Sequence, residues 1–190
     1  MARPAKHRRD ILLEKLSGIF RLYGYDGASM SVLSSASGLS KASLYHHFPG
    51  GKQEMAEKVL GEEGKRLQRL VLEPFDAHLR ASNALINSLQ GVGQFYDGDQ
   101  PSCLMNSVMH GTGVALFGQG IESVVSAWLR RYADAYTEIC GDRLEGDEWA
   151  AYALERIQGA LILSRVKSER KFLMRCLDEL QGDVAIVAAA

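Results

Sequence analysis

The sequence predicts an all-helical fold, and three observations support this. Apolar residues recur at spacings of three and four along most of the chain, as they do on one face of an α-helix. No stretch of useful length alternates apolar and polar residues in the way that a half-buried strand requires. Glycine, proline and aspartate punctuate the helical stretches. Besides a short helix that ends at Gly38, we expect helices over residues 8–23, 41–47, 53–72, 75–90, 102–111, 119–140, 147–166 and 168–181.

Length and composition favour a protein that folds without covalent or metal cross-links. The 190 residues are 46% hydrophobic, which is enough for a sizeable core. The three cysteines, Cys103, Cys140 and Cys176, are far apart and odd in number, so they predict neither a disulfide framework nor a metal-binding pair. No apolar run reaches the roughly 18 residues of a membrane span, and the basic N-terminus lacks a signal-peptide core. We therefore expect a soluble cytoplasmic protein without a cofactor, a bound metal or a membrane partner.

Charge divides the chain into two parts. Residues 1–53 hold eight Lys and Arg against three acidic residues, a net charge of +5, whereas the rest of the chain carries −6 of the overall −1. A basic segment on an acidic body suits a chain of which only one end approaches a polyanion. A solvated basic terminus would have the same charge, so the sequence motifs have to decide between the two. We expect one domain over residues 1–53 and a second over residues 54–190.

The basic part has the spacing of a helix-turn-helix. After a first amphipathic helix, the turn residues "GYDGAS" follow, and Ser29 or Ser31 can cap the next helix. Gly38 can adopt the left-handed conformation that ends this second helix, and Ser40 can cap a third helix that runs from Lys41 to His47. Two short helices around a turn of about three or four residues are typical of DNA-binding helix-turn-helix domains. We therefore predict a three-helix DNA-binding domain at the N-terminus.

The third helix divides into a packing face and a reading face. Leu44 and Phe48 are four residues apart and are expected to pack on the other two helices. The outward residues are small or form hydrogen bonds, which suits a close approach to base edges and phosphates. Beyond Pro49, Lys52 stands at the start of another helix, where a lysine is unfavourable unless an anion such as phosphate lies there. The predicted DNA-binding residues are Ser31, Ser40, Lys41, Ala42, Ser43, Tyr45, His46 and Lys52.

The stretch "GLSKASLYHHFPGGKQEM" resembles the DNA-binding signature of the TetR family of one-component transcriptional regulators, with a match from about residue 8 to 60. Within it, "SLYHHFPGGK" is similar to the branch that responds to lincomycin-type drugs and flavonoids. The resemblance implies that the third helix enters the major groove, that Tyr45 and Lys52 contact backbone phosphates, and that Phe48 belongs to the core. It also implies a helical ligand-binding and dimerisation domain after the DNA-binding domain.

The function implied is that of a ligand-responsive regulator. A dimer with two-fold symmetry would bind a palindromic operator in double-stranded DNA. A small aromatic or drug-like effector would release such a repressor from its operator. Activators and repressors look alike at this level. The alternative is a helical interaction protein or a small enzyme that retains a helix-turn-helix-like N-terminus. No GxSxG, HExxH or nucleophile–base pattern occurs in the sequence, so we predict that the protein is not an enzyme.

The second part of the chain contains residues that suit a ligand cavity and residues that suit a dimer face. Bulky side chains on several helices lie near glycines, as a drug-sized aromatic ligand requires, although each one alone is more typical of core. Apolar and small residues recur on the last two helices, which suits either a four-helix bundle between two subunits or the core of a monomer. The predicted ligand-binding residues are Phe95, Met105, Met109, Phe117, Trp128, Tyr132 and Tyr136, and the predicted dimer residues are Ala153, Ile157, Ala160, Leu161, Phe172, Leu173, Cys176, Leu177 and Leu180.

Overall fold

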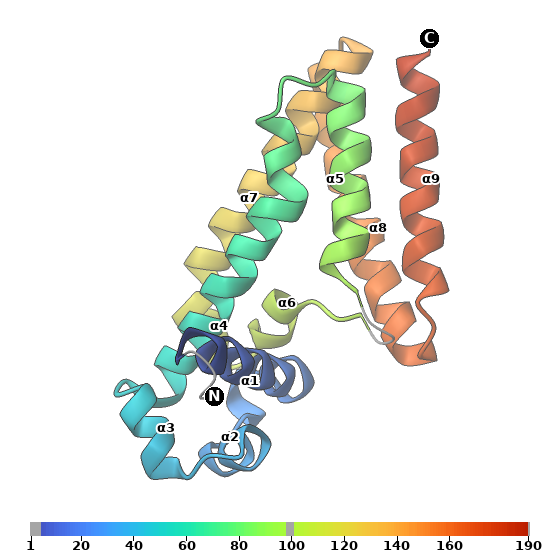
Figure 1. Cartoon of the computed structure of the whole chain (residues 1–190). Helices are drawn as coiled ribbons and strands as arrows, with labels where there is room; N and C mark the ends of the chain where they lie inside the picture. Colours follow the sequence, from blue (N-terminus) through green and yellow to red (C-terminus); the bar gives the residue numbers. More distant parts are fainter. Residues whose placement is uncertain (1–4, 98–100, 190) are drawn as a thin grey trace. The chain divides into compact units, whose positions relative to one another are not determined.

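The computed structural model describes residues 5–97 and 101–189, and every regular element in those residues is a helix (Figure 1). The predicted all-helical fold is confirmed for this part of the chain. None of the helices described is both long enough and apolar enough to cross a membrane. The elements are α1 (Ala5–Gly27), α2 (Met30–Ser37), α3 (Lys41–His47), α4 (Gly51–Leu67), the π-helix η1 (Gln68–Leu72), the 3₁₀-helix η2 (Glu73–Phe75), α5 (Ala81–Phe95), α6 (Leu104–Val108), α7 (Thr112–Cys140), α8 (Arg143–Lys167) and α9 (Lys171–Ala188).

Contacts divide the chain into two compact units. The first unit comprises the described residues of Met1–Gly64 together with Leu104–Ile121, and the second comprises those of Lys65–Cys103 and Glu122–Ala190. Helix α6 and the first turns of α7 thus share a unit with α1, α2 and α3, although they are distant in sequence. The functional boundary after residue 53 stays a prediction.

The first unit is built on one apolar core. Phe20 of α1, Leu33 of α2 and Leu44 of α3 are wholly buried in it, and Phe48 is 1% exposed. Helices α4, α6 and α7 contribute further apolar side chains to the same cluster. The predicted packing face of the third helix is therefore confirmed.

Local sequence signals set the ends of α2 and α3. The Ser29 hydroxyl accepts a hydrogen bond from the Val32 amide at 3.3 Å, so it caps α2. Gly38 has the left-handed φ of 73° that ends α2. Ser40 caps α3 by accepting a hydrogen bond from the Ser43 amide at 3.1 Å. The predicted turn and the predicted bounds of the third helix are both confirmed.

Helix α1 continues beyond its predicted end, but its geometry breaks at Gly24. This residue has a φ of 65°, a conformation that favours glycine. A Cβ atom at Gly24 would lie 2.8 Å from the carbonyl oxygen of Ser107 in α6. The glycine therefore permits both the change in chain direction and the close approach of α6 to the end of α1.

In the second unit, α9 lies beside both α5 and α8 (Figure 1). The chain enters this unit in the last turn of α4 and continues through η1 and η2. Pro74, the predicted stop signal of the preceding helix, lies in η2. The Ser88 hydroxyl of α5 donates a hydrogen bond to the Val71 carbonyl of η1 at 2.7 Å. This bond satisfies a buried backbone acceptor in a stretch where the regular α-helical pattern has ended.

Helix α7 is longer than predicted. It begins at Thr112 and includes three glycines that suggested a break in the chain. A Cβ atom at Gly113 would lie 1.9 Å from the Val108 carbonyl oxygen, so this glycine permits tight packing of α7 against α6. Five other helices also differ from expectation. Helix α4 spans residues 51–67 instead of 53–72, α5 spans 81–95 instead of 75–90, and α6 spans 104–108 instead of 102–111. Helix α8 spans 143–167 instead of 147–166, and α9 spans 171–188 instead of 168–181.

Gly91→Ala is expected to destabilise the protein, because a Cβ atom at Gly91 would lie 1.8 Å from the Leu70 carbonyl oxygen. Relieving such a backbone clash typically costs about 1–3 kcal/mol of unfolding free energy. Gly61→Ala is the matched control, since a Cβ atom at this exposed position in α4 meets nothing within 4 Å. The control should be neutral or stabilising by up to about 1 kcal/mol. Denaturant unfolding followed by circular dichroism measures both, and equal stability of the two variants would contradict the packing described here.

Candidate nucleic-acid interface

Helix α3 presents one polar side that its own packing leaves accessible. It has only seven residues, too few for a helix that is stable by itself, so the burial of Leu44 holds it in place. Lys41, Ala42, Tyr45 and His46 are exposed on the other side. These four predicted DNA-binding residues therefore lie together on an accessible surface of the first unit.

The predicted serines have more than one role. The Ser40 hydroxyl caps α3 and also lies 3.0 Å from the Ser43 hydroxyl. Ser43 is half-buried, whereas Ser31 is exposed on α2. Ser40 thus holds the first turn of α3 in shape, and Ser43 is the serine on the face of α3 that carries Lys41 and Ala42.

The Tyr45 ring lies against the start of α4. A Cβ atom at Gly51 would be 3.2 Å from Cε1 of this ring, and the φ of 66° at Gly51 favours glycine as well. The tyrosine is 50% exposed, so its ring is partly supported by backbone and partly open to solvent. The glycine pair predicts a turn at this point, but the contact with the ring cannot be inferred from the sequence.

Lys52 lies in the first turn of α4 with its ammonium group held by the end of α1. Its Nζ donates a hydrogen bond to the Tyr25 carbonyl at 2.9 Å and lies 4.1 Å from the centroid of the Tyr25 ring. A lysine ammonium has three donor protons, so two remain for an anion. Lys52 is half-buried and can therefore still be reached from solvent.

Two backbone amides at the start of α4 are already bonded. The Gly50 amide donates to the Glu54 carboxylate at 2.8 Å, and the Gly51 amide donates to the Phe48 carbonyl at 2.9 Å. The sequence suggested that free amides and the lysine would hold a phosphate together. In this structure the ammonium group of Lys52 keeps two unused donor protons, whereas the Gly50 and Gly51 amides are already bonded.

Asp26, which no sequence motif singles out, bonds the first residue of α7. Its carboxylate accepts a hydrogen bond from the Thr112 amide at 2.9 Å and another from the Thr112 hydroxyl. These two bonds, with a smaller contribution from Lys52, lower the pKa of Asp26 below its usual value. The partners are 86 residues apart, which explains why sequence patterns do not reveal the pair.

Comparisons with known proteins agree with this geometry. Residues 12–59 match the family described as bacterial regulatory proteins, tetR family. The chain is 22% identical over 176 residues to the uncharacterized HTH-type transcriptional regulator YxaF of Bacillus subtilis, a match that covers 90% of this chain and 92% of that protein. It is also 32% identical over 69 residues to the HTH-type transcriptional regulator LmrA of the same species, which covers 36% and 37% of the two chains.

Solved structures share the fold of this chain. SCO4454, a TetR-family transcriptional regulator from Streptomyces coelicolor, matches with a TM-score of 0.76 at 14% identity, over 96% of this chain and 97% of that one. A cysteine mutant of the TetR-family regulator CifR, solved with a 26 bp double-strand operator DNA, matches with a TM-score of 0.73 at 18% identity, over 95% and 98% of the chains.

Residues 12–59 of the chain thus match the tetR family of bacterial regulatory proteins. The matched residues contain α2, α3 and the first half of α4. The region that matches the family is thus the region in which Lys41, Tyr45 and His46 are exposed and Lys52 is held at the start of α4.

The predicted ligand-binding residues are divided between the two units of the chain. Phe117 packs in the first unit, where its ring meets the Tyr25 ring edge-on at 5.1 Å. The seven residues are therefore not gathered within either unit. Met105, Met109 and Phe117 belong to the first unit, and Phe95, Trp128, Tyr132 and Tyr136 belong to the second.

Three of these residues form a buried aromatic cluster with Trp149 of α8. Tyr136 stacks on Trp149 with 4.4 Å between the ring centroids, and Tyr132 lies 5.9 Å from Trp149 and 6.0 Å from Trp128. All four side chains are at least 93% buried. The cluster joins α7 to α8, and it concentrates large aromatic surface in one part of the second unit.

The cluster contains polar atoms in two different states. The Tyr132 hydroxyl is bonded to the Ser88 hydroxyl at 3.0 Å, and burial raises the pKa of Tyr132 to about 12, so the phenol remains neutral. In contrast, the buried Trp149 Nε1 and Thr137 Oγ1 have no hydrogen-bond partner among the described residues. Buried polar groups usually have partners, so a bound molecule could satisfy Trp149 Nε1 and the nearby Thr137 Oγ1.

The predicted dimer residues are mostly buried within one chain. Leu173, Leu177 and Leu180 of α9 are at most 1% exposed, because this face of the helix packs against α5 and α8. Ala153, Ile157, Ala160, Leu161 and Cys176 are buried in the same way, and only Phe172 of the predicted set is half-buried. In this structure the stripe packs within its own chain, and a role of these residues at a dimer interface stays a prediction.

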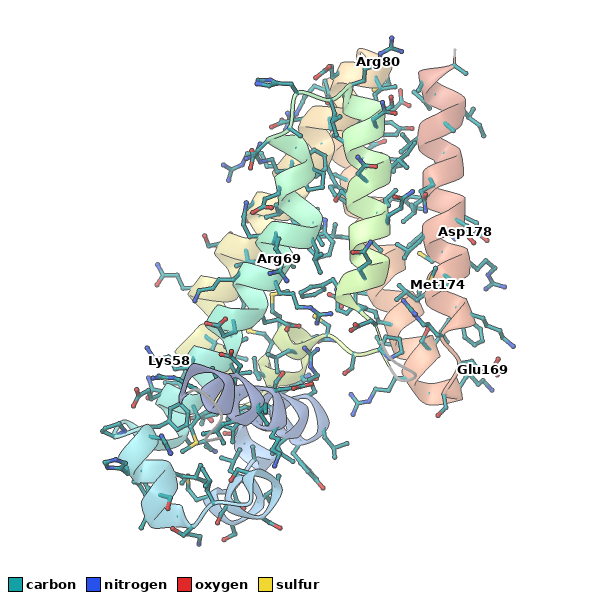
Figure 2. The ribbon with its side chains drawn as sticks, in the orientation of Figure 1. Lys58, Arg69, Arg80, Glu169, Met174 and Asp178 are labelled. Atoms are coloured by element: carbon teal, nitrogen blue, oxygen red, sulfur yellow. The ribbon has the colours of Figure 1, made fainter. Side chains whose placement is uncertain are left out.

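Other apolar residues of α8 and α9 are exposed. On α8, Tyr152, Leu163 and Val166 are 45%, 48% and 72% exposed. On α9, Met174 is 39% and Ile186 is 72% exposed, and Met174 is labelled in Figure 2. We define these five residues as the α8–α9 outer stripe. All five are exposed side chains of these two helices.

Proposed function

We propose that the protein is a homodimeric transcriptional repressor of the TetR type. It would bind a palindromic operator through α3 and leave it when a small aromatic molecule binds in the second unit. The proposal rests on the arrangement of α3. This serine-capped helix is fixed by the buried Leu44, and its Lys41, Tyr45 and His46 side chains are exposed to solvent. DNA binding is the activity that the family match supports. The structural neighbour CifR was solved with a double-strand operator DNA, which also supports DNA binding.

In the proposed complex, α3 lies in the major groove. Lys41, Ser43 and His46 are suited to base edges, because their side chains donate or accept hydrogen bonds and Ala42 beside them permits close approach. Tyr45 and Lys52 are suited to phosphates on the groove wall, which fix position without reading sequence. Ser31 and Ser40 are suited to contacts at the edges of this surface.

The proposed dimer uses the α8–α9 outer stripe. A second copy is the occupant that this stripe fits, because the same two helices would face each other across a two-fold axis and bury like against like. Gly159 of α8 is exposed with open space around it, which permits a close approach of another helix. Such a dimer would present two α3 helices to half-sites separated by about one turn of DNA.

The proposed effector site is the aromatic cluster of the second unit. Trp149 Nε1 and Thr137 Oγ1 would supply polar contacts to an aromatic ligand among stacked rings. The resemblance of "SLYHHFPGGK" to the lincomycin- and flavonoid-responsive branch suggests the class of ligand. Helix α7 carries Trp128 and Tyr132, and its first residue, Thr112, bonds Asp26, so one helix connects the proposed effector site to the DNA-binding unit.

Lys52→Ala is expected to weaken binding to every DNA sequence, because it removes a phosphate contact. The slope of log affinity against log salt concentration should fall by about one unit per lysine in contact with DNA. Lys58→Ala is the matched control, since Lys58 is exposed on the same helix (Figure 2). Fluorescence anisotropy with DNA from upstream of the protein's own gene, and with random DNA, measures both variants. An unchanged affinity and slope for Lys52→Ala would contradict the phosphate contact.

The double variant Val166→Glu with Ile186→Glu is expected to be monomeric, because it places charges in the α8–α9 outer stripe. Sedimentation equilibrium should give twice 20.9 kDa for the wild type and 20.9 kDa for the variant. Leu22→Glu, which also places a charge at an exposed leucine but in α1, should remain dimeric. A dimer that persists in the double variant would show that another surface joins the subunits.

An effector is expected to quench tryptophan emission and to lower operator affinity at the same concentrations. Trp128 and Trp149 are the two tryptophans of the chain, and both belong to the aromatic cluster. Lincomycin and a flavonoid are the probes, with N-acetyltryptophanamide as the control for optical absorption. Typical coupling predicts a loss of about 5- to 150-fold in operator affinity. Saturated quenching with unchanged DNA affinity would contradict release by the effector.

A further inference from the structure

We infer that two adjacent residues at the end of α1, Tyr25 and Asp26, position Lys52 for its phosphate contact and connect this lysine to the first turn of α7. We call these two residues the Tyr25–Asp26 step. Nothing in the sequence signature assigns a role to either residue of the step. The inference rests on the proposed function, because it requires that Lys52 binds DNA. It adds two positioning residues behind the predicted contact residues.

Tyr25 holds the ammonium group of Lys52 in two ways. Its backbone carbonyl accepts a hydrogen bond from Nζ at 2.9 Å, and its ring centroid lies 4.1 Å from the same atom. A free lysine loses much rotamer freedom when it binds a phosphate, and this loss opposes binding. A lysine that is already held over Tyr25 loses less, and it still has two donor protons for the phosphate oxygens.

The Tyr25 ring is itself fixed by the core of the first unit. It meets Phe117 of α7 edge-on at 5.1 Å with an interplanar angle of 79°, and it stacks on Phe20 of α1 at 6.4 Å. Both phenylalanines are buried. The ring therefore presents its face to Lys52 from a position that the neighbouring aromatic residues determine.

Asp26 ties the same step to the start of α7. Its carboxylate accepts hydrogen bonds from the amide and the hydroxyl of Thr112, and a negative charge is favourable at a helix N-terminus. A Cβ atom at Gly111 would lie 2.1 Å from Oδ2 of Asp26, and the φ of 55° at Gly111 also favours glycine. The turn between α6 and α7 is thus shaped to receive this carboxylate.

These contacts form one continuous link inside the first unit, from Thr112 and Phe117 of α7 through Tyr25 and Asp26 to Lys52. A displacement of the first turn of α7 would move Asp26 and the Tyr25 ring, and both hold the position of Lys52. The DNA contact of the lysine would then weaken without any change in its charge. Removal of a residue that itself contacts DNA has a different effect, because it changes the number of phosphates that are neutralised.

A double-mutant cycle of Tyr25→Leu and Lys52→Ala tests the inference, with anisotropy binding to the upstream DNA as the readout. Tyr25→Leu should lower affinity about two- to fivefold, as expected for the loss of an exposed cation–π contact, and should leave the salt slope unchanged. The combined variant should bind no more weakly than Lys52→Ala alone. Tyr25→Phe should bind like the wild type. Tyr23→Leu, at a tyrosine of the same helix that is 51% exposed, is the control.

A second variant keeps the test decisive if Tyr25→Leu does not fold. Thr112→Val removes the hydroxyl donor to Asp26 but leaves the backbone amide in place, and it should lower DNA affinity with the salt slope unchanged. Ser123→Ala, at an exposed serine of α7, is its control. Thermal unfolding of each variant shows whether the affinity change occurs in a folded protein.

The possible outcomes separate this inference from the proposed function. A wild-type protein that binds no DNA overturns both. If the wild type binds and Lys52→Ala does not weaken it, the phosphate contact and the inference fail together. If Lys52→Ala weakens binding but the losses from Tyr25→Leu and Lys52→Ala add, or if Tyr25→Leu binds like the wild type, only the inference fails.

Discussion

The burial of Leu44 and Phe48 is the constraint on which the proposed DNA surface depends. A helix of seven residues gains too little from its own hydrogen bonds to be stable in water, so these two side chains keep α3 folded by packing into the core of the first unit. Because they are four residues apart, they fix the rotation of α3 about its axis as well as its presence. That rotation decides that Lys41 and His46 face solvent. A loss of packing at Leu44 would therefore remove the reading surface before any contact residue was changed.

Lys52 has an unfavourable position at the start of α4, and its contact with Tyr25 compensates for part of this cost. An ammonium group near a helix N-terminus meets the positive end of the helix dipole, and the Tyr25 carbonyl and ring offset part of that repulsion. Glu54, in the same turn, adds a favourable negative charge and bonds the Gly50 amide. The start of α4 is thus stable without DNA, and a phosphate would add to an ammonium group that is already oriented.

Local signals predicted much of this fold, whereas contacts between distant segments could not be predicted. Capping by Ser40 and the left-handed conformation of Gly38 depend on a few neighbouring residues, so they could be identified from the sequence. Gly113 has the same chemistry as a turn glycine, but it lies inside α7 because of a neighbour in α6. Helical spacing shows that Leu177 is buried, but it cannot show whether the partner is its own chain or a second copy. The pairing of Asp26 with a residue 86 positions away has no local signal at all.

The pKa values of Asp26 and Tyr25 bear on whether a change in pH could break the contacts that link Lys52 to α7. The pKa of Asp26 is lowered, mainly by its bonds to Thr112, so the charged carboxylate is stabilised in the folded state above its ordinary pKa. That stabilisation is lost only as the pH falls through the lowered folded pKa, far below neutrality. The pKa of Tyr25 is raised, mainly by burial, so its phenol stays neutral at neutral pH. Since neither group changes charge near neutral pH, protonation does not break the link there, and a displacement of the first turn of α7 is what would break it.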